Sequence, residues 1–165
     1  MKRPTGGGIV FHNEAEVTYS LVMDKNDPRL PKGLVSAYKV ISKAIVCALR
    51  KVGVDAKIGT KVSRLRRAQS SRHQGIKEKG EELCFAWPAE YEVVCQGKKI
   101  VGSAQKRGRK ALLQQGSIFV RNDLQNVLPL QHINAISVEE VLQRKISFKE
   151  IAYALVEGFS EIFQL

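Results

Sequence analysis

The segment Cys84–Gln105, CFAWPAEYEVVCQGKKIVGSAQ, holds the residues of this 165-residue chain that are best suited to covalent chemistry. Cys84 carries a thiol, and its thiolate form is a strong nucleophile. A free thiol with a pKa near ~8.5 is only slightly ionised at neutral pH, so a reactive Cys84 needs a nearby cation, and Lys99 is the candidate. The alternative is a small buried hydrophobic residue beside Phe85 and Trp87. Taken alone, the residues favour that alternative.

The remaining cysteines and the histidines give no sign of a metal or disulfide site. Three cysteines at 47, 84 and 95 form no CxxC pair, and His12, His73 and His132 are isolated along the chain. We therefore predict reduced thiols, no structural metal, and packing roles for Cys47 and Cys95.

A second candidate feature is the polar alternation that follows Cys95. A strand period of two places Lys99, Val101, Ser103 and Gln105 on one face and Ile100, Gly102 and Ala104 on the other. This pattern fits either a solvated outer face or a surface that contacts a ligand. Gly102 favours the second interpretation slightly, because a glycine inside a strand often marks close approach by a ligand or backbone.

Three successive glycines, Gly6, Gly7 and Gly8, precede strand-forming residues in PTGGGIVF. Glycines let main-chain N–H groups approach a ligand, although a flexible turn explains them equally well. They do not form a Walker phosphate loop, which requires a Gly-Lys-Ser/Thr sequence at the start of a helix.

The charge of the chain predicts acidic partners. It has 27 basic and 16 acidic residues, a net charge of +11, and such a field speeds encounters with anionic molecules. The basic excess is concentrated in residues 61–80, which we predict to be a mobile surface loop. A nucleic-acid-binding role for Arg64, Arg66, Arg67 and Arg72 is a remote alternative, because this loop has no aromatic side chains to stack on bases. No apolar run suggests a membrane span or secretory signal, so we expect a cytoplasmic protein.

Several elements must position these residues. We predict two short strands within residues 8–23, a helix over residues 34–52 ending at Gly53, and a strand at 54–58. One apolar stripe on that helix contains Leu34, Tyr38, Ile41, Ile45, Leu49 and Val52. A hairpin follows over residues 91–105, turning near Gly97, and then a strand at 116–120. Two capping boxes, Ser137 with Glu140 and Ser147 with Glu150, begin the last helices. The order predicts one α+β domain, residues 1–165, with a mixed, mostly antiparallel sheet and packed helices. The last helix should bury Ile151, Leu155, Phe159 and Ile162.

Together, these motifs resemble the lipoate-protein ligase and octanoyltransferase family within the biotin/lipoyl ligase-like superfamily. The resemblance runs through KRPTGGGIVFHN, VTYSLV, LCFAWPAEYEVVCQGKKIVGSAQKR, LLQQGSIFV and SVEEVLQRKISFKEIAYALVEGF, in that order. It implies a mixed sheet that walls a narrow acyl pocket. It also implies that Lys99 contacts the acyl carbonyl and that Cys84 is the nucleophile of a cysteine-dependent octanoyltransferase. The pocket residues that it implies are Arg3, Gly6, Gly7, Gly8, His12, Ser103 and Gln105.

The activity implied is transfer of an octanoyl group from acyl carrier protein, through a thioester on Cys84, to a lysine of a lipoyl-accepting domain such as the glycine-cleavage H protein. This acyltransferase needs no cofactor. The alternatives are an ATP- and Mg²⁺-dependent lipoate-protein ligase and a lipoyl amidotransferase, and all three keep Lys99. Both carriers are acidic proteins in this family, which accounts for the charge of +11 without a nucleic acid or membrane partner.

The chain departs from the family pattern at three places. Lys2 stands where an arginine is usual, and Gln115 stands where relatives commonly have a histidine, so an acid or base role at 115 is in doubt. Relatives also carry strands and a helix before the glycine motif. A mis-called start codon, a partner chain that supplies the missing part and a decayed gene product each explain this difference, and the intact capping boxes disfavour decay. If the chain is as given, we expect an exposed strand edge near its start that pairs with a partner chain or with a second copy.

Overall fold

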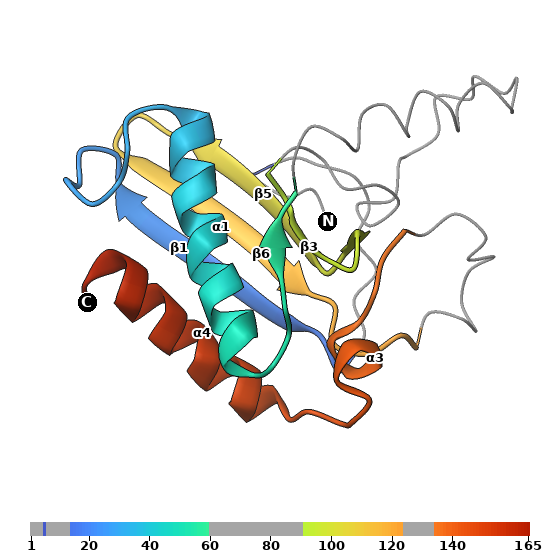
Figure 1. Ribbon diagram of the computed structural model, residues 1–165. Coiled ribbons are helices and arrows are strands. Elements are labelled where there is room, and N and C mark those ends of the chain that lie inside the picture. Colours follow the sequence, from blue (N-terminus) through green and yellow to red (C-terminus); the bar gives the residue numbers. More distant parts are fainter. Residues whose placement is uncertain (1–4, 6–13, 60–90, 124–133) are drawn as a thin grey trace, which may run out of the picture.

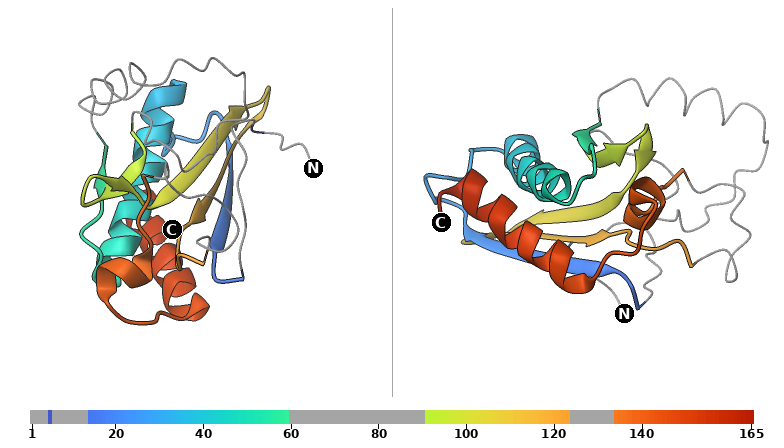
Figure 2. Two further views of the ribbon diagram at one scale, coloured as in Figure 1. Left: turned by 90° about the vertical axis from the view of Figure 1, so that its right-hand side faces the viewer. Right: turned by 60° about the horizontal axis from the view of Figure 1, so that its bottom comes forward.

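The structure, a computed structural model, describes residues 5, 14–59, 91–123 and 134–165 (Figure 1). The described part has two layers, with a three-stranded sheet on one side and two long helices on the other (Figures 1 and 2). This arrangement confirms the predicted α+β class. The first of the two short strands predicted near the start of the chain and the basic loop at residues 61–80 lie outside the described residues.

The larger sheet has the order β1-β6-β5, with β1 Val17–Asp24, β5 Val101–Arg107 and β6 Ala111–Ile118. Both strand pairs are antiparallel, and the register places Tyr19, Gly116 and Ser103 in one row across the sheet. Since neighbouring residues point to opposite faces, this row lies on the same face as the buried Val17, Leu112 and Ile118. β6 begins at Ala111, five residues before the strand predicted at 116.

Two helices cover that face, α1 Leu34–Lys51 and α4 Phe148–Phe163 (Figure 2). α1 buries Ile41, Ile45 and Leu49 against the sheet and α4, and it ends before Gly53, whose φ is +94°. The predicted stripe is confirmed except at its first residue, because Leu34 is 52% exposed. In α4, Ile151 and Leu155 are buried, while Phe159 and Ile162 are partly buried against the core.

A second, smaller antiparallel sheet has the order β2-β3-β4, with β2 Lys57–Ile58, β3 Val93–Cys95 and β4 Lys98–Lys99. The β3–β4 turn contains Gln96 and Gly97, whose φ angles are +51° and +75°. Two residues at positive φ form the tight turn that suits a two-residue hairpin. The predicted turn near Gly97 is therefore confirmed, but the hairpin ends at Lys99. The chain then crosses at Ile100 into the larger sheet.

Both predicted capping boxes are present. The Ser137 hydroxyl accepts from the Glu140 N–H, and the Glu140 carboxylate accepts from the Ser137 N–H, at the start of α3 Val138–Leu142. Ser147 and Glu150 make the same pair of bonds at the start of α4. These caps fix the entry to each helix.

Two kinds of feature are missing from the described ranges. None of the helices there is long and apolar enough to span a membrane. Nor do three or more His, Cys, Asp or Glu side chains gather there as a metal would require.

Candidate active site

Lys99 forms a buried ion pair. Its side chain is 2% exposed, and its Nζ donates to Glu92 Oε1 at 2.6 Å, with the Glu92 side chain 8% exposed. Removing two charges from water is costly, and mutual attraction at this distance offsets part of that cost. The solvated-face interpretation is therefore wrong for Lys99, which places a cation inside the protein.

The backbone of Lys99 is held on both sides. Val94 is its partner in β3, and a parallel bridge joins it to Ala135. The Lys99 N–H donates to Asn134 O at 2.9 Å, and its carbonyl accepts from the Ile136 N–H at 2.9 Å. Because the backbone is anchored in this way, the Lys99 side chain extends from a fixed position.

Glu92 was not among the residues that we expected at the site, although the turn chemistry could have identified it. A two-residue turn at Gln96–Gly97 sets Val94 opposite Lys99. Glu92 is two residues before Val94 and therefore lies on the same face, diagonal to Lys99. Long side chains bridge such diagonal positions across antiparallel strands. Glu92 and Lys99 consequently meet.

Ser103 and Gln105 do not continue the row begun by Lys99, so that prediction is wrong. They belong to β5, in the other sheet, and they point towards the helices. Ser103 Oγ lies 2.7 Å from the Tyr19 hydroxyl, and Gln105 Nε2 donates to Gln114 Oε1 at 2.8 Å. The physical reason is the change of sheet at Ile100, which period counting does not detect. The predicted contact of Ser103 and Gln105 with the substrate stays a prediction.

Tyr19 is the centre of this polar network under the helices. Its hydroxyl also accepts from Gln114 Nε2 at 3.2 Å, and its ring lies 6.0 Å from the ring of Phe159 in α4. Burial raises the pKa of Tyr19 to about 12, although its hydrogen bonds with Ser103 and Gln114 act in the opposite direction. The network has a structural role between sheet and helices.

The opposite face of the larger sheet carries different residues. Gly102 and Ser117 are register partners there, and both are buried. Gln115 lies on the same face and accepts a long hydrogen bond, 3.5 Å, from the Thr5 hydroxyl. Thr5 directly precedes the three glycines in the sequence. The residue immediately before the glycine motif therefore contacts the face away from the helices.

The two described cysteines have the properties of packing residues. Cys95 is 3% exposed, and burial raises the pKa of its thiol. Cys47 is partly buried, and burial together with a hydrogen bond to Glu161 raises the pKa of its thiol. A raised pKa keeps both thiols protonated and unreactive near neutral pH. The predicted packing role is thus confirmed for Cys95.

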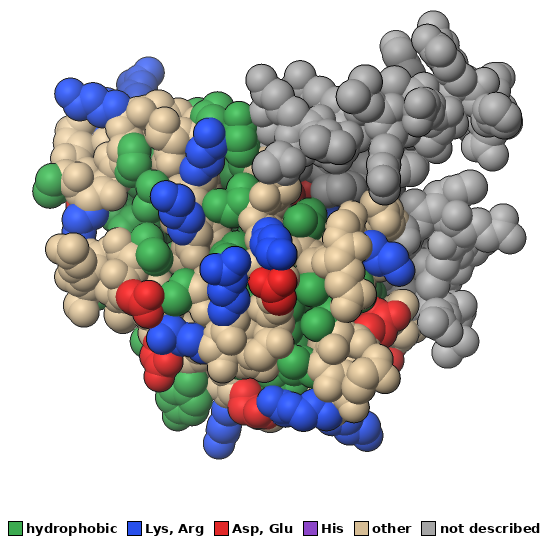
Figure 3. Space-filling model, in the orientation of Figure 1, with side chains coloured by type: hydrophobic (Ala, Val, Ile, Leu, Met, Phe, Trp, Pro, Cys, Tyr) green, Lys and Arg blue, Asp and Glu red, His purple; other side chains and the backbone are tan. Residues whose placement is uncertain are grey.

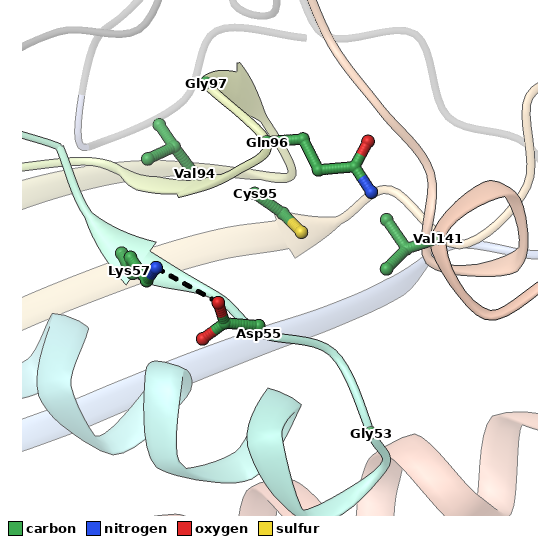
Figure 4. Close-up of a pocket in the computed structure, with 8 residues that line it drawn as sticks. All are labelled: Gly53, Asp55, Lys57, Val94, Cys95, Gln96, Gly97 and Val141. Carbon is green, nitrogen blue, oxygen red and sulfur yellow. Dashed lines mark ion pairs between the residues drawn. The ribbon is translucent and has the colours of Figure 1, made fainter.

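Cys95 also lines a pocket of about 380 Å³. The charged groups there, Asp55 and Lys57, are paired with each other at 3.0 Å. The Cys95 thiol points towards the side where Val141 lies (Figure 4). Lys99 is not among the lining residues, so this pocket is separate from the ion pair. The lining residues are Gly53, Asp55, Lys57, Val94, Cys95, Gln96, Gly97 and Val141.

The six other predicted site residues lie outside the described residues. These are Cys84, Arg3, Gly6, Gly7, Gly8 and His12. Their assignment, and the distance from Cys84 to Lys99, stay predictions.

Basic side chains gather at one end of the molecule, which we call the basic end and define as residues 24–32 and 106–110. The Lys25 N–H donates to Lys110 O at 2.9 Å, and Arg107 Nη2 donates to Lys25 O at 3.2 Å, so the two segments are neighbours. They carry seven Lys and Arg against Asp24 and Asp27. Asp27 already pairs with Arg29 at 2.6 Å. Figure 3 shows basic side chains at its upper left, the side on which β1 and β5 end in Figure 1.

Comparison with known proteins agrees with this geometry. A curated relative, the octanoyltransferase LipM of Kyrpidia tusciae, is 34% identical over 98% of this chain and 61% of its own length. LipM of Bacillus subtilis is 30% identical over 96% of this chain and 60% of its own length. The chain thus spans about three fifths of the length of these relatives.

Solved structures share the fold. A bi-partite lipoate protein ligase from Thermoplasma acidophilum superimposes with a TM-score of 0.68 at 22% identity, over 98% of this chain and 56% of the other. The biotin protein ligase from Aquifex aeolicus, in complex with biotin and ATP, gives a TM-score of 0.64 at 14% identity, over 99% and 58%. At these identities the likeness establishes the fold alone.

The family assignment rests on nearly the whole chain. Residues 1–160 match the lipoyl protein ligase A/B catalytic domain. The predicted sheet, the capped helices and the buried lysine of the GKKIVGSA segment are all present in the described residues. The chain therefore belongs to the lipoyl protein ligase A/B catalytic domain family.

Proposed function

We propose that residues 1–165 act as one catalytic domain that transfers an octanoyl group from acyl carrier protein, through Cys84, to a lysine of a lipoyl-accepting domain. The observation that carries the proposal is the buried Lys99–Glu92 pair, which keeps a cation in the segment that follows Cys84 in the sequence. The names of the relatives, octanoyltransferases, support the same reaction class.

The first step forms an acyl-enzyme. The Cys84 thiolate attacks the thioester carbonyl, a bond forms between Cys84 Sγ and the acyl carbon, and the carbon–sulfur bond to the carrier breaks. The carrier leaves as a thiol after taking up the proton that Cys84 released. Lys99 favours the thiolate and stabilises the negative charge that develops on the carbonyl oxygen.

The second step releases the product. The amine of the acceptor lysine attacks the same carbonyl, a carbon–nitrogen bond forms, and Cys84 Sγ leaves. The amine gives up a proton, and Cys84 regains one, so the enzyme returns to its starting state. The product is a stable amide, and the sequence of steps requires no cofactor.

The partners that we propose are acidic proteins, an acyl carrier protein as donor and a lipoyl domain such as the glycine-cleavage H protein as acceptor. The net charge of +11 and the cations of the basic end favour their approach.

β1 is an edge strand of the described sheet. Light scattering tests the predicted pairing with a second copy, which a stable monomer would contradict.

The test is covalent capture. The purified chain is incubated with octanoyl-acyl carrier protein in the absence of ATP, and its mass is measured intact and after peptide digestion. We expect one octanoyl group on Cys84, no adduct on Cys84→Ser, and a normal adduct on the control Cys95→Ser. Transfer that requires ATP and survives in Cys84→Ser would instead identify a lipoate ligase. Transfer only from an already lipoylated domain would identify an amidotransferase.

A further inference from the structure

We propose that Glu92 is the positioning residue of Lys99, whose carboxylate holds the ammonium group where the reacting thioester needs it. The inference rests on the proposed function and adds a residue to its machinery. Glu92 acts through Lys99 and does not itself contact the reacting atoms.

Stability alone does not explain the pair. Both side chains are almost fully buried, at 2% and 8% exposure. Replacing a buried ion pair by well-packed apolar residues of similar volume is often neutral or stabilising, so two charges here are weak candidates for a purely structural role. A buried cation is useful where negative charge develops during a reaction.

The geometry explains why the carboxylate is needed. The Lys99 side chain is a flexible four-carbon stem, and its ammonium can adopt many positions. The backbone bonds to Asn134 and Ile136 fix where this stem begins. The 2.6 Å contact with Glu92 Oε1 fixes where it ends. With both ends held, the ammonium needs no reorganisation when the tetrahedral intermediate forms.

The backbone position of Glu92, which carries the carboxylate, is equally well defined. Glu92 is joined to Lys99 through the tight turn at Gln96–Gly97, and its main-chain carbonyl accepts from the Gly59 N–H at 2.7 Å. The backbone of Glu92, from which the carboxylate side chain extends, is therefore anchored to the neighbouring chain segment. Shortening or neutralising it should displace the ammonium without changing the hairpin.

The experiment compares Glu92→Gln, Lys99→Met and the double variant. Glu139→Gln is the matched control, because Glu139 is a largely buried carboxylate that is paired with a different cation, Arg121, at 3.0 Å. Thermal unfolding first defines the folded fraction. The rate of octanoylation of Cys84 is then measured in single turnovers against the concentration of octanoyl-acyl carrier protein.

We expect Glu92→Gln to lower the rate at saturating donor by about 10- to 100-fold while the half-saturating concentration changes little. The control should keep the wild-type rate. In the double variant, Glu92→Gln should cause no loss beyond that of Lys99→Met, because Glu92 acts only through Lys99. If Glu92 had only a structural role, Glu92→Gln would lower the rate both in the wild type and in Lys99→Met.

Four outcomes overturn the inference. If Glu92→Gln folds and reacts at the wild-type rate, the positioning role is wrong but the proposed function stands. The same conclusion follows if the double variant reacts more slowly than Lys99→Met. If Glu92→Gln does not fold, Glu92→Asp keeps the charge and withdraws it by one methylene. A wild-type rate in Glu92→Asp would then overturn the role. A wild-type chain that forms no adduct on Cys84 overturns the proposed function itself, and the positioning role with it.

Discussion

The ring of Tyr19 lies across Gly116 and reaches a third strand. Tyr19, Gly116 and Ser103 are consecutive partners in β1, β6 and β5. A Cβ built on Gly116 would lie 2.3 Å from Cε1 of Tyr19. The missing side chain on the middle strand therefore makes room for the ring, and the Tyr19 hydroxyl meets Ser103 Oγ at 2.7 Å. This row ties three strands together beneath α4.

A methyl group at position 116 should break this row. The Tyr19 ring cannot move aside without losing its contacts with Ser103, Gln114 and Phe159. We expect Gly116→Ala to lower the free energy of unfolding by about 1–3 kcal/mol in urea titrations. In a Tyr19→Leu background the flexible leucine leaves space, and the same substitution should cost less than about 0.5 kcal/mol. Equal costs in both backgrounds would contradict this account.

Stability at high pH should depend on Tyr19. Below pH 10 both the folded and the unfolded chain keep the Tyr19 proton, so Tyr19 adds no pH dependence there. Between pH 10 and about 12 the unfolded chain loses this proton and the folded chain keeps it, because burial raises the pKa of Tyr19 to about 12. The wild type should lose up to about 3 kcal/mol more than Tyr19→Phe over this window. Urea unfolding at pH 9, 10 and 11 measures the free energy of unfolding of both proteins. If this free energy changes equally with pH in the two proteins, the prediction is wrong.

The packing of α4 on α1 should depend on Gly158. A Cβ at this position would lie 2.5 Å from Ala44 O and 2.8 Å from Ala48 N, and both are backbone atoms of α1 that cannot move alone. Alanine improves helix propensity by about 1 kcal/mol, but forcing the helices apart should cost more, so we expect a net loss of about 1–2 kcal/mol. Val156→Ala, at a position 65% exposed, is the control on the same helix and should change stability by less than about 0.5 kcal/mol. A stabilised Gly158→Ala would show that the helices separate easily.

Local chemistry made much of the fold predictable. The capping boxes at Ser137 and Ser147, the end of α1 at Gly53 and the turn at Gly97 each depend on residues that are adjacent in sequence. Hydrophobic periodicity likewise predicted the buried faces of α1 and α4, because each face is repeated over several turns. Such signals are independent of distant contacts.

The site was less predictable because it depends on contacts between segments far apart in the chain. Period counting treated Lys99 and Ser103 as one row, whereas the change of sheet at Ile100 separates them. The bridge from Lys99 to Ala135 joins positions that no local pattern relates. Glu92 was accessible to sequence reasoning only through the hairpin register, which pairs Val94 with Lys99.

The basic end provides a test of how acidic partners approach. Arg109 and Lys110 are exposed in the turn between β5 and β6, and the neighbouring cations outnumber the carboxylates. Reversing both charges, Arg109→Glu with Lys110→Glu, should lower kcat/KM for octanoyl-acyl carrier protein by about 10-fold at low salt, with kcat unchanged. The loss should shrink as ionic strength rises, because salt screens exposed charges.

The matched control reverses Lys145 and Lys149, two exposed cations near the start of α4 at another part of the surface. Glu139 and Glu150 already offset positive charge there, so the same change of net charge should have a much smaller effect on the encounter rate. Equal losses for both pairs of substitutions would mean that net charge alone governs approach. A loss confined to the basic end would locate the encounter surface, because an attraction that depends on position requires the partner's carboxylates to pass close to those side chains.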